Sequence, residues 1–226
     1  MNKITNALFE MQDLKFKDFT SKLIPTVSKE KVIGVRTPDL RRLAKGLSDE
    51  ERRTFISELP HIYHEENLLH GFILQIISKD IKVVIIETEK FLPYIDNWAV
   101  CDTSQSKVFG KYPDLTFERA SEWAKSEKTY TVRFAIDVLL QFFLDDNFRP
   151  EVLSLAESII SDEYYINMAL AWFWSFALIK RYDKTLPIIE AQRLPTFVHN
   201  KAIQKARESY RISDERKEYL NSLKIK

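Results

Sequence analysis

Apolar side chains recur every three or four residues along most of this chain, which is the spacing of one face of an α-helix. The segment from Glu65 to Lys79 shows the pattern most clearly. Only four glycines and eight prolines occur among 226 residues, so there is little of the turn chemistry that a β fold requires. The sequence therefore predicts an all-α fold with short connections between helices.

Capping signals predict where several of these helices begin and end. Thr37 is the expected N-cap of a basic helix, with Pro38 in its first turn and Gly46 at its end. Ser48 and Glu51 have the spacing of a capping box, which predicts that the next helix starts directly after Ser48. Further helix starts are expected at Asp114, Thr129, Pro150, Glu163, Lys184, Thr196 and Ser213.

The predicted helices form pairs along the chain. We expect about a dozen helices of roughly 10 to 18 residues, paired at intervals of about 35 to 45 residues, which is the spacing of two-helix solenoid repeats of the HEAT kind. The β-branched run at 83–86 is ambiguous by propensity alone, but its helical neighbours favour a helix over 80–92. The prediction is one domain over residues 1–226, a superhelix whose concave face binds a partner.

Composition excludes several classes of protein. The single cysteine, Cys101, cannot form an internal disulfide framework or a multi-cysteine zinc site, and it fits a reducing compartment such as the cytoplasm. No run of 18 apolar residues is present, so we expect a protein without membrane spans. His64 and His70 flank two glutamates, but Leu68 stands where a zincin needs its second histidine. We expect no metal and no cofactor, with both histidines structural.

Charge is distributed unevenly although the formal net charge is only +1. Residues 29–53 hold eight basic and five acidic side chains, and residues 195–226 hold eight basic and four acidic ones. If both ends reach the same concave face, they can hold the phosphates of a DNA duplex; ordinary solvated helix faces are the alternative. The candidate DNA contacts are Arg36, Arg41, Arg42, Lys45, Lys201 and Lys205.

A few residues near the middle of the chain have the chemistry of a site. Trp98 and Asp102 are four residues apart, so an indole and a carboxylate share one face of a helix that begins near Asn97. Arg133 lies in an otherwise apolar run, and a buried arginine needs a counter-charge such as Asp102 or a DNA phosphate. Trp172 and Trp174 point in different directions on a helix, so one is expected in the core and the other in a cleft.

Five blocks of the sequence, in order, resemble a known family. They are Val32–Lys45, Ile95–Asp102, Tyr130–Ala135, Met168–Trp172 and His199–Ala206. Together they resemble the DNA alkylation repair family of AlkD-like glycosylases over nearly the whole chain. The resemblance implies a HEAT-like superhelix that acts as a monomer without a cofactor, holds duplex DNA in its concave groove, and excises cationic N3- or N7-alkylated purines in base excision repair.

Carried over by position, the resemblance assigns roles to four residues. Trp98 and Trp172 become the cleft tryptophans, Asp102 the catalytic carboxylate, and Arg133 the arginine that holds a backbone phosphate. A cationic alkylpurine is already a good leaving group, so an anion that stabilises the oxocarbenium-like transition state suffices without a general acid. One such pair at about 4 Å and an effective dielectric near 20 contributes roughly 4 kcal/mol, about a thousandfold in rate.

The N-terminal region departs from the family's pattern. It is short, and the aliphatic Leu23 and Ile24 stand where active relatives place an aromatic helix residue beside the lesion. Two alternatives to a glycosylase therefore stay open. One is a non-catalytic member that recognises DNA structure, and the other is a protein-interaction solenoid without affinity for DNA.

Overall fold

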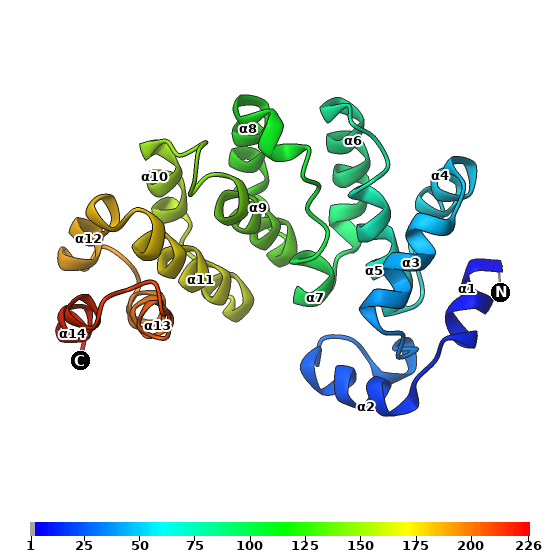
Figure 1. Cartoon of the computed structure of the whole chain (residues 1–226), viewed down its shortest axis with the longest axis horizontal. Helices are drawn as coiled ribbons and strands as arrows, with labels where there is room; N and C mark the ends of the chain where they lie inside the picture. Colours follow the sequence, from blue (N-terminus) through cyan, green and yellow to red (C-terminus); the bar gives the residue numbers. More distant parts are fainter. Residues whose placement is uncertain (1–2) are drawn as a thin grey trace. The chain divides into compact units, whose positions relative to one another are not determined.

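The computed structural model describes residues 3–226, and within this range it contains 14 α-helices, three short 3₁₀-helices and no strand (Figure 1). The predicted all-α class is confirmed, and the packing of successive helices against their neighbours is that of a helical solenoid. None of the described helices is long and apolar enough to cross a membrane. The chain divides into two compact units, Met1–Val108 and Phe109–Lys226.

The first unit is organised around one helix that is buried on every side. All residues of α5 (His64–Leu74) are buried, and α3, α4, α6 and α7 contact it. A helix surrounded in this way needs no exposed polar face, and its polar side chains, such as Glu65 and Glu66, have partners inside the unit. The other elements of this unit are α1 (Lys3–Glu10), α2 (Leu14–Leu23), η1 (Lys29–Lys31), α3 (Thr37–Gly46), α4 (Asp49–Ser57), α6 (Ile81–Phe91), η2 (Leu92–Tyr94) and α7 (Trp98–Cys101).

The second unit contains helices in two rows (Figure 1). The helices α9, α11 and α13 pack against one another in that order, while α8, α10 and α12 form the other row. About half of the long helix α11 is buried, because α9, α12 and α13 all contact it. The elements of this unit are η3 (Phe109–Lys111), α8 (Pro113–Trp123), α9 (Thr129–Phe142), α10 (Pro150–Ser158), α11 (Tyr164–Lys180), α12 (Tyr182–Glu190), α13 (Thr196–Arg207) and α14 (Asp214–Ser222).

Most predicted helix starts are confirmed. The capping box is present, with Ser48 Oγ accepting from the Glu51 N–H at 3.2 Å and the Glu51 carboxylate accepting from the Ser48 N–H at 2.9 Å. Ser213 caps α14, and its side chain accepts from the Arg216 N–H. The β-branched run lies in α6 as expected, with Asp80 as the N-cap.

Four predicted boundaries are wrong by one to a few residues. The helix predicted from Lys184 begins at Tyr182. Thr37 is the first residue of α3 rather than its cap, and the extended Arg36 precedes it. The helix predicted from Asp114 begins at Pro113, whose fixed φ and missing N–H suit a first turn. The helix predicted to continue to Lys79 ends at Leu74, and its C-cap Gln75 donates its side-chain amide to the Thr103 carbonyl.

Candidate nucleic-acid interface

The short helix α7 holds Trp98 and Asp102 one turn apart, as the sequence predicted. Asn97 caps the helix, and its side-chain oxygen accepts from the Val100 N–H at 3.1 Å. The Asp102 N–H donates to the Trp98 carbonyl at 2.9 Å, which closes the single turn that puts both side chains on one face. Both residues are partly exposed. An indole and a carboxylate therefore reach the surface of the first unit together.

Trp98 is fixed to α2 by a hydrogen bond between residues far apart in the sequence. Its indole Nε1–H donates to the Leu23 carbonyl at 2.9 Å, and the ring packs against a buried cluster that includes Ile24. Leu23 and Ile24, which the sequence placed beside the site, are thus its direct neighbours. The hydrogen bond sets the orientation of the indole, because the ring can satisfy its one donor only in this pose.

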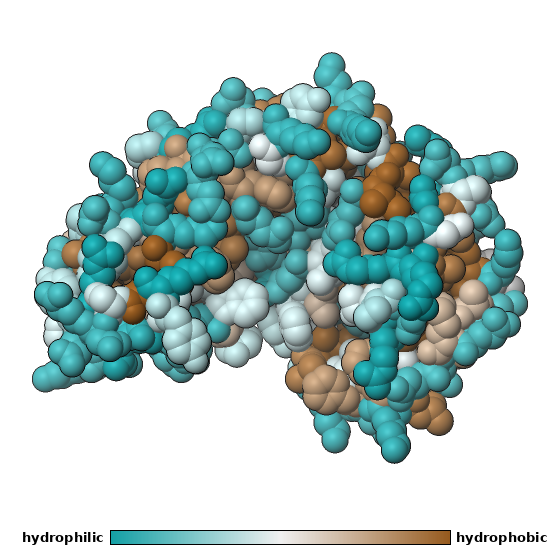
Figure 2. Space-filling view, in the orientation of Figure 1, coloured by the Kyte–Doolittle hydropathy of each residue, from teal (hydrophilic) through white to brown (hydrophobic). Residues whose placement is uncertain are grey.

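Two aromatic residues that the sequence reasoning missed lie beside Trp98. Phe16 and Phe19 of α2 line the same apolar pocket, of about 230 Å³, as Trp98 and Leu23. Phe19 is 58% exposed although it is aromatic, and Figure 2 shows apolar surface over α2. The signal was present in the sequence, since two phenylalanines three residues apart share one helix face. The first unit therefore places aromatic side chains near its candidate site, although Leu23 and Ile24 themselves are aliphatic.

The helix α2 has no buried residue, so polar contacts at its N-terminus hold it in place. Asp13 caps α2 by accepting from the Phe16 N–H at 3.0 Å, and it pairs with Arg36 at 2.7 Å. The cap hydrogen bond and the Arg36 guanidinium lower the pKa of Asp13 below its usual value. The Asp13 N–H also donates to the Gly34 carbonyl at 2.9 Å. The segment before α3 is thereby joined to α2.

Gly34 is required at this junction for two reasons. Its φ of +97° lies in the left-handed region, and a Cβ there would come within 2.5 Å of the Asp13 carbonyl oxygen and 2.7 Å of the Lys17 Cβ. Only glycine allows the two backbones to approach this closely. The position of α2, and with it the pose of Trp98, therefore depends on a glycine.

A buried carboxylate holds the same segment from the other side. Glu65 accepts from the backbone N–H groups of Ile33 at 2.7 Å, Gly34 at 2.7 Å and Val35 at 3.3 Å. Burial raises the pKa of Glu65, and the backbone donors act in the opposite direction. The neighbouring Glu66 is also a structural anchor, because it accepts from Thr5 Oγ1 at 2.6 Å and from two backbone N–H groups of the loop before α5.

The two histidines of the rejected zincin pattern have separate partners in the core. The side-chain amide of Asn97 lies 3.3 Å from His64 Nδ1, and His61 Nε2 lies 2.9 Å from His70 Nδ1. The His70 ring also stacks on Phe91 with centroids 3.9 Å apart. Burial lowers the pKa of His61 and of His64 to about 4, and it lowers that of His70 well below its usual value.

The four basic candidates at the start of the chain differ in how they are engaged. Arg36 pairs with Asp13 and lies over the Phe16 ring, 5.0 Å from its centroid. Arg41 lies over the Phe72 ring, at 4.1 Å, and donates to the Gln75 side chain. Arg42 is exposed and pairs with Asp39 at 2.8 Å, and Lys45 is exposed at the end of α3. Leu40 and Ala44 form the buried face of α3, so Arg41, Arg42 and Lys45 remain on its solvent side.

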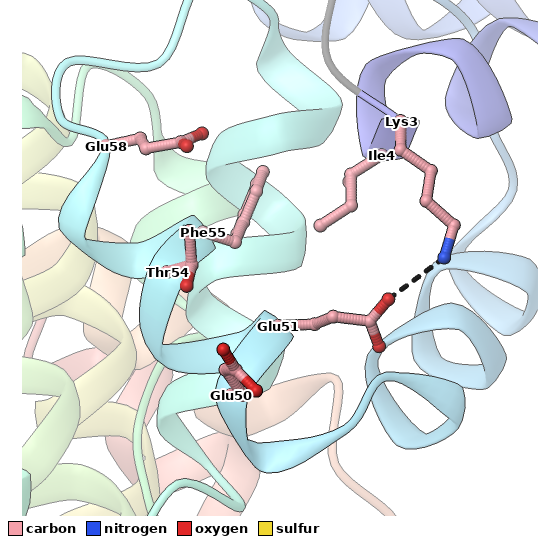
Figure 3. A pocket seen from close by; sticks show the side chains of 7 residues that line it. All are labelled: Lys3, Ile4, Glu50, Glu51, Thr54, Phe55 and Glu58. Carbon is pink, nitrogen blue, oxygen red and sulfur yellow. Dashed lines mark hydrogen bonds and ion pairs between the residues drawn. The ribbon is translucent and has the colours of Figure 1, made fainter.

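A second pocket of the first unit, between α1 and α4, has the wrong charge for a DNA phosphate (Figure 3). Its floor is formed by Ile4 and Phe55, and the carboxylates of Glu50, Glu51 and Glu58 surround it. Glu51 accepts from Lys3 Nζ at 3.0 Å. The Ser48 backbone N–H, together with Lys3, lowers the pKa of Glu51 to about 2. We exclude this pocket from the candidate interface.

Arg133 lies in the second unit and is buried, with 4% of its surface exposed. Its Nη1 donates to the Tyr165 carbonyl at 2.7 Å, which connects α9 to the first turn of α11. The Tyr165 carbonyl is a neutral acceptor, so the predicted counter-charge from Asp102 or a DNA phosphate stays a prediction. The guanidinium holds two helices of the unit together in addition to any role toward DNA.

The tryptophan pair of α11 divides as the helix spacing predicts. Trp174 is fully buried and packs edge-on against Phe173, with centroids 5.2 Å apart. Trp172 is 38% exposed, and Lys205 Nζ lies 5.0 Å from the centroid of its ring. Burial lowers the pKa of Lys205 below its usual value. Trp172 is therefore the member of the pair that can contact a ligand.

The candidate residues thus fall into two groups, each within one compact unit. Trp98, Asp102 and the arginines and lysine around α3 belong to the first unit, and Arg133, Trp172, Lys201 and Lys205 belong to the second. Lys201 is partly exposed, and its Nζ donates to Gln204 Oε1 at 3.0 Å. Each unit presents a tryptophan at its surface together with charged side chains.

In the described residues, each unit is an array of packed helices that presents a tryptophan and basic side chains at its surface. Residues 4–206 match the model of the DNA alkylation repair enzyme family, which is nearly the whole chain. The chain therefore belongs to this family, whose description indicates a role in the repair of alkylated DNA. No curated protein matches the chain closely enough to add a relative.

Proposed function

We propose that this protein is a DNA glycosylase that excises cationic N3- and N7-alkylated purines from duplex DNA by hydrolysing the N-glycosidic bond. The observation that carries the proposal is the face of α7, where a partly exposed carboxylate lies one turn from a partly exposed indole in a chain of the alkylation repair family. The proposed fold is a HEAT-like superhelix that binds the duplex.

In this proposal Asp102 stabilises the positive charge that develops on the deoxyribose as the bond breaks, and it orients the attacking water. The leaving base carries its own positive charge, so it departs as a neutral purine without a proton from the enzyme. Trp98 and Trp172 contact the damaged nucleotide through their ring faces, which attract cations. The basic side chains on α3 and α13 hold the phosphates, and Arg133 holds the phosphate beside the lesion.

The test is release of the base from duplex DNA that contains 7-methylguanine. We expect wild-type protein to generate abasic sites in this DNA and to leave a duplex with an uncharged lesion intact. Asp102→Asn should slow release about a thousandfold, the effect of losing roughly 4 kcal/mol of transition-state stabilisation. Asp96→Asn is the matched control, because Asp96 is an exposed carboxylate on the same segment before α7.

Two outcomes would reject the catalytic proposal. The first is no base release by the wild type at high enzyme excess, and the second is release by Asp102→Asn at the wild-type rate. If wild type and Asp102→Asn bind the duplex alike, lose affinity steeply with salt and release no base, the protein recognises DNA structure without catalysis. If a titration with duplex DNA detects no binding, the result would favour the protein-interaction solenoid instead.

A further inference from the structure

Two helices of the second unit lie side by side in the same direction and in matched register. The Tyr164 and Phe197 ring centroids are 6.1 Å apart, and Lys205 Nζ lies 5.0 Å from the Trp172 centroid. Both contacts join residues 33 positions apart, so α11 and α13 keep one alignment over two helical turns, a distance of about 12 Å. Met168 and Lys201 fall between the two contacts, and both are partly exposed.

These six residues form a surface that we call the α11–α13 ridge: Tyr164, Met168, Trp172, Phe197, Lys201 and Lys205. Its large rings are exposed, at 57% for Tyr164 and 44% for Phe197. The aromatic end continues toward α9, because the Tyr164 ring contacts Tyr165 at 5.3 Å and Tyr165 contacts Tyr130 at 5.8 Å. Aromatic side chains therefore contact one another across α9, α11 and α13.

The chemistry of the ridge favours one kind of partner. A ligand that covers these exposed rings would remove their apolar surface from water, which is favourable. Rings alone could fit a protein, but Lys201 and Lys205, one turn apart on α13, add the positive charge that a phosphate backbone requires. Aromatic faces next to lysines are the combination that binds unpaired nucleic acid, in which bases stack on the rings and phosphates meet the cations.

We propose that the α11–α13 ridge binds a single-stranded stretch of DNA, with unpaired bases stacked on Tyr164 and Phe197 and the backbone following Lys201 and Lys205. The length of the ridge suits about two nucleotides of an extended strand. This function goes beyond base excision and does not require that the protein cleaves any glycosidic bond. Failure of the excision assay would leave it unaffected, and its own failure would leave the excision proposal unaffected.

The test compares two labelled oligonucleotides of equal length by fluorescence anisotropy with the full-length protein. One is a twelve-residue oligothymidylate, and the other has the same backbone with abasic residues throughout. Stacking requires the bases, so the wild type should bind oligothymidylate at least about tenfold more tightly than the abasic strand. The double variant Tyr164→Ala/Phe197→Ala should bind both strands within about twofold of each other, at the affinity the wild type has for the abasic strand.

Two further variants keep the result interpretable. Tyr164→Leu/Phe197→Leu keeps apolar volume but removes the aromatic faces, so it should lose the preference for bases even if the alanine variant folds poorly. Tyr210→Ala removes a fully exposed tyrosine elsewhere in the same unit and should keep the preference. Equal binding of both strands by the wild type, or a retained preference in the leucine variant, would overturn the proposal. Absence of binding to either strand would overturn it as well and would assign the ridge to a protein partner.

Discussion

Trp98 and Trp172, the two tryptophans proposed to contact the damaged nucleotide, are held in contrasting ways. The Trp98 indole is fixed by a hydrogen bond to the Leu23 carbonyl and by packing against the core cluster around Ile24. The Trp172 ring is more open and meets a lysine side chain over its face. One tryptophan depends on contacts between distant segments, whereas the other depends on the regular packing of neighbouring helices.

The surroundings of the two tryptophans show the same contrast between contacts of distant segments and regular helix packing. In the first unit, buried polar groups join separate segments: Glu65 holds the strand-like segment before α3, and Glu66 holds α1. In the second unit, α11 and α13 keep one register over two turns. This difference indicates that the orientation of Trp98 is sensitive to changes in charge and backbone geometry nearby. The orientation of Trp172 should tolerate both kinds of change.

The largest expected difference between the units is in their response to acid. His61 and His64 have pKa values near 4 in the folded chain, below the usual 6.5. The unfolded chain therefore takes up protons first as the pH falls below about 6.5, and stability is lost between there and about 4. From pH 7 to pH 5 we expect a loss of about 3 kcal/mol from these two histidines together.

Hydrogen exchange measured by peptide mass spectrometry at both pH values, corrected for intrinsic rates, localises this effect. Peptides from α5 should lose protection at pH 5 relative to peptides from α11. Equal changes in the two helices would contradict the assignment of acid sensitivity to the first unit.

Removing the charge of Glu65 is expected to have the next largest effect. In Glu65→Gln an amide group replaces one carboxylate oxygen, so at least one of the three backbone N–H groups loses its acceptor inside the protein. A loss of about 2 to 3 kcal/mol in the free energy of unfolding is expected from urea titration. Glu122→Gln, an exposed carboxylate paired with Lys125 in the second unit, should change stability by less than about 0.5 kcal/mol.

Alanine substitutions at two glycines of the first unit should change the free energy of unfolding in opposite directions. Gly34→Ala places a side chain at positive φ and against Asp13 and Lys17, and we expect it to cost about 2 kcal/mol. Gly46→Ala lies in the last turn of α3 with open space around it, so it should stabilise by about 0.5 kcal/mol. If urea titrations give both variants a change in the free energy of unfolding of the same sign, the proposed role of Gly34 is rejected.

The smallest expected effect compares the two tryptophans directly. Trp98→Phe removes the hydrogen bond to the Leu23 carbonyl and part of the packing of the indole, which should cost about 1 kcal/mol of stability. Trp172→Phe keeps an aromatic face for Lys205, and its cost should stay below about 0.5 kcal/mol. A greater loss of stability from Trp172→Phe than from Trp98→Phe would contradict the conclusion that Trp98 is the more firmly held of the two.

The helical fold and much of its local detail can be predicted from the sequence alone. Periodic apolar residues and capping signals act over one or two turns, so the helix at 80–92 and the capping box at Ser48 could be predicted without tertiary information. The turn that joins Trp98 to Asp102 is equally local, since one N-cap at Asn97 sets it. Helix spacing also predicted that Trp172 and Trp174 must separate into surface and core.

The packing of the helices was needed to show which of those two tryptophans is exposed, because that depends on how neighbouring helices cover α11. It was also needed to show that Trp98 is fixed by a residue 75 positions earlier, that Phe16 and Phe19 lie in the same pocket, and that Glu65 is a backbone acceptor. Hydrogen bonds and packing between distant segments depend on the whole fold, and no local pattern encodes them.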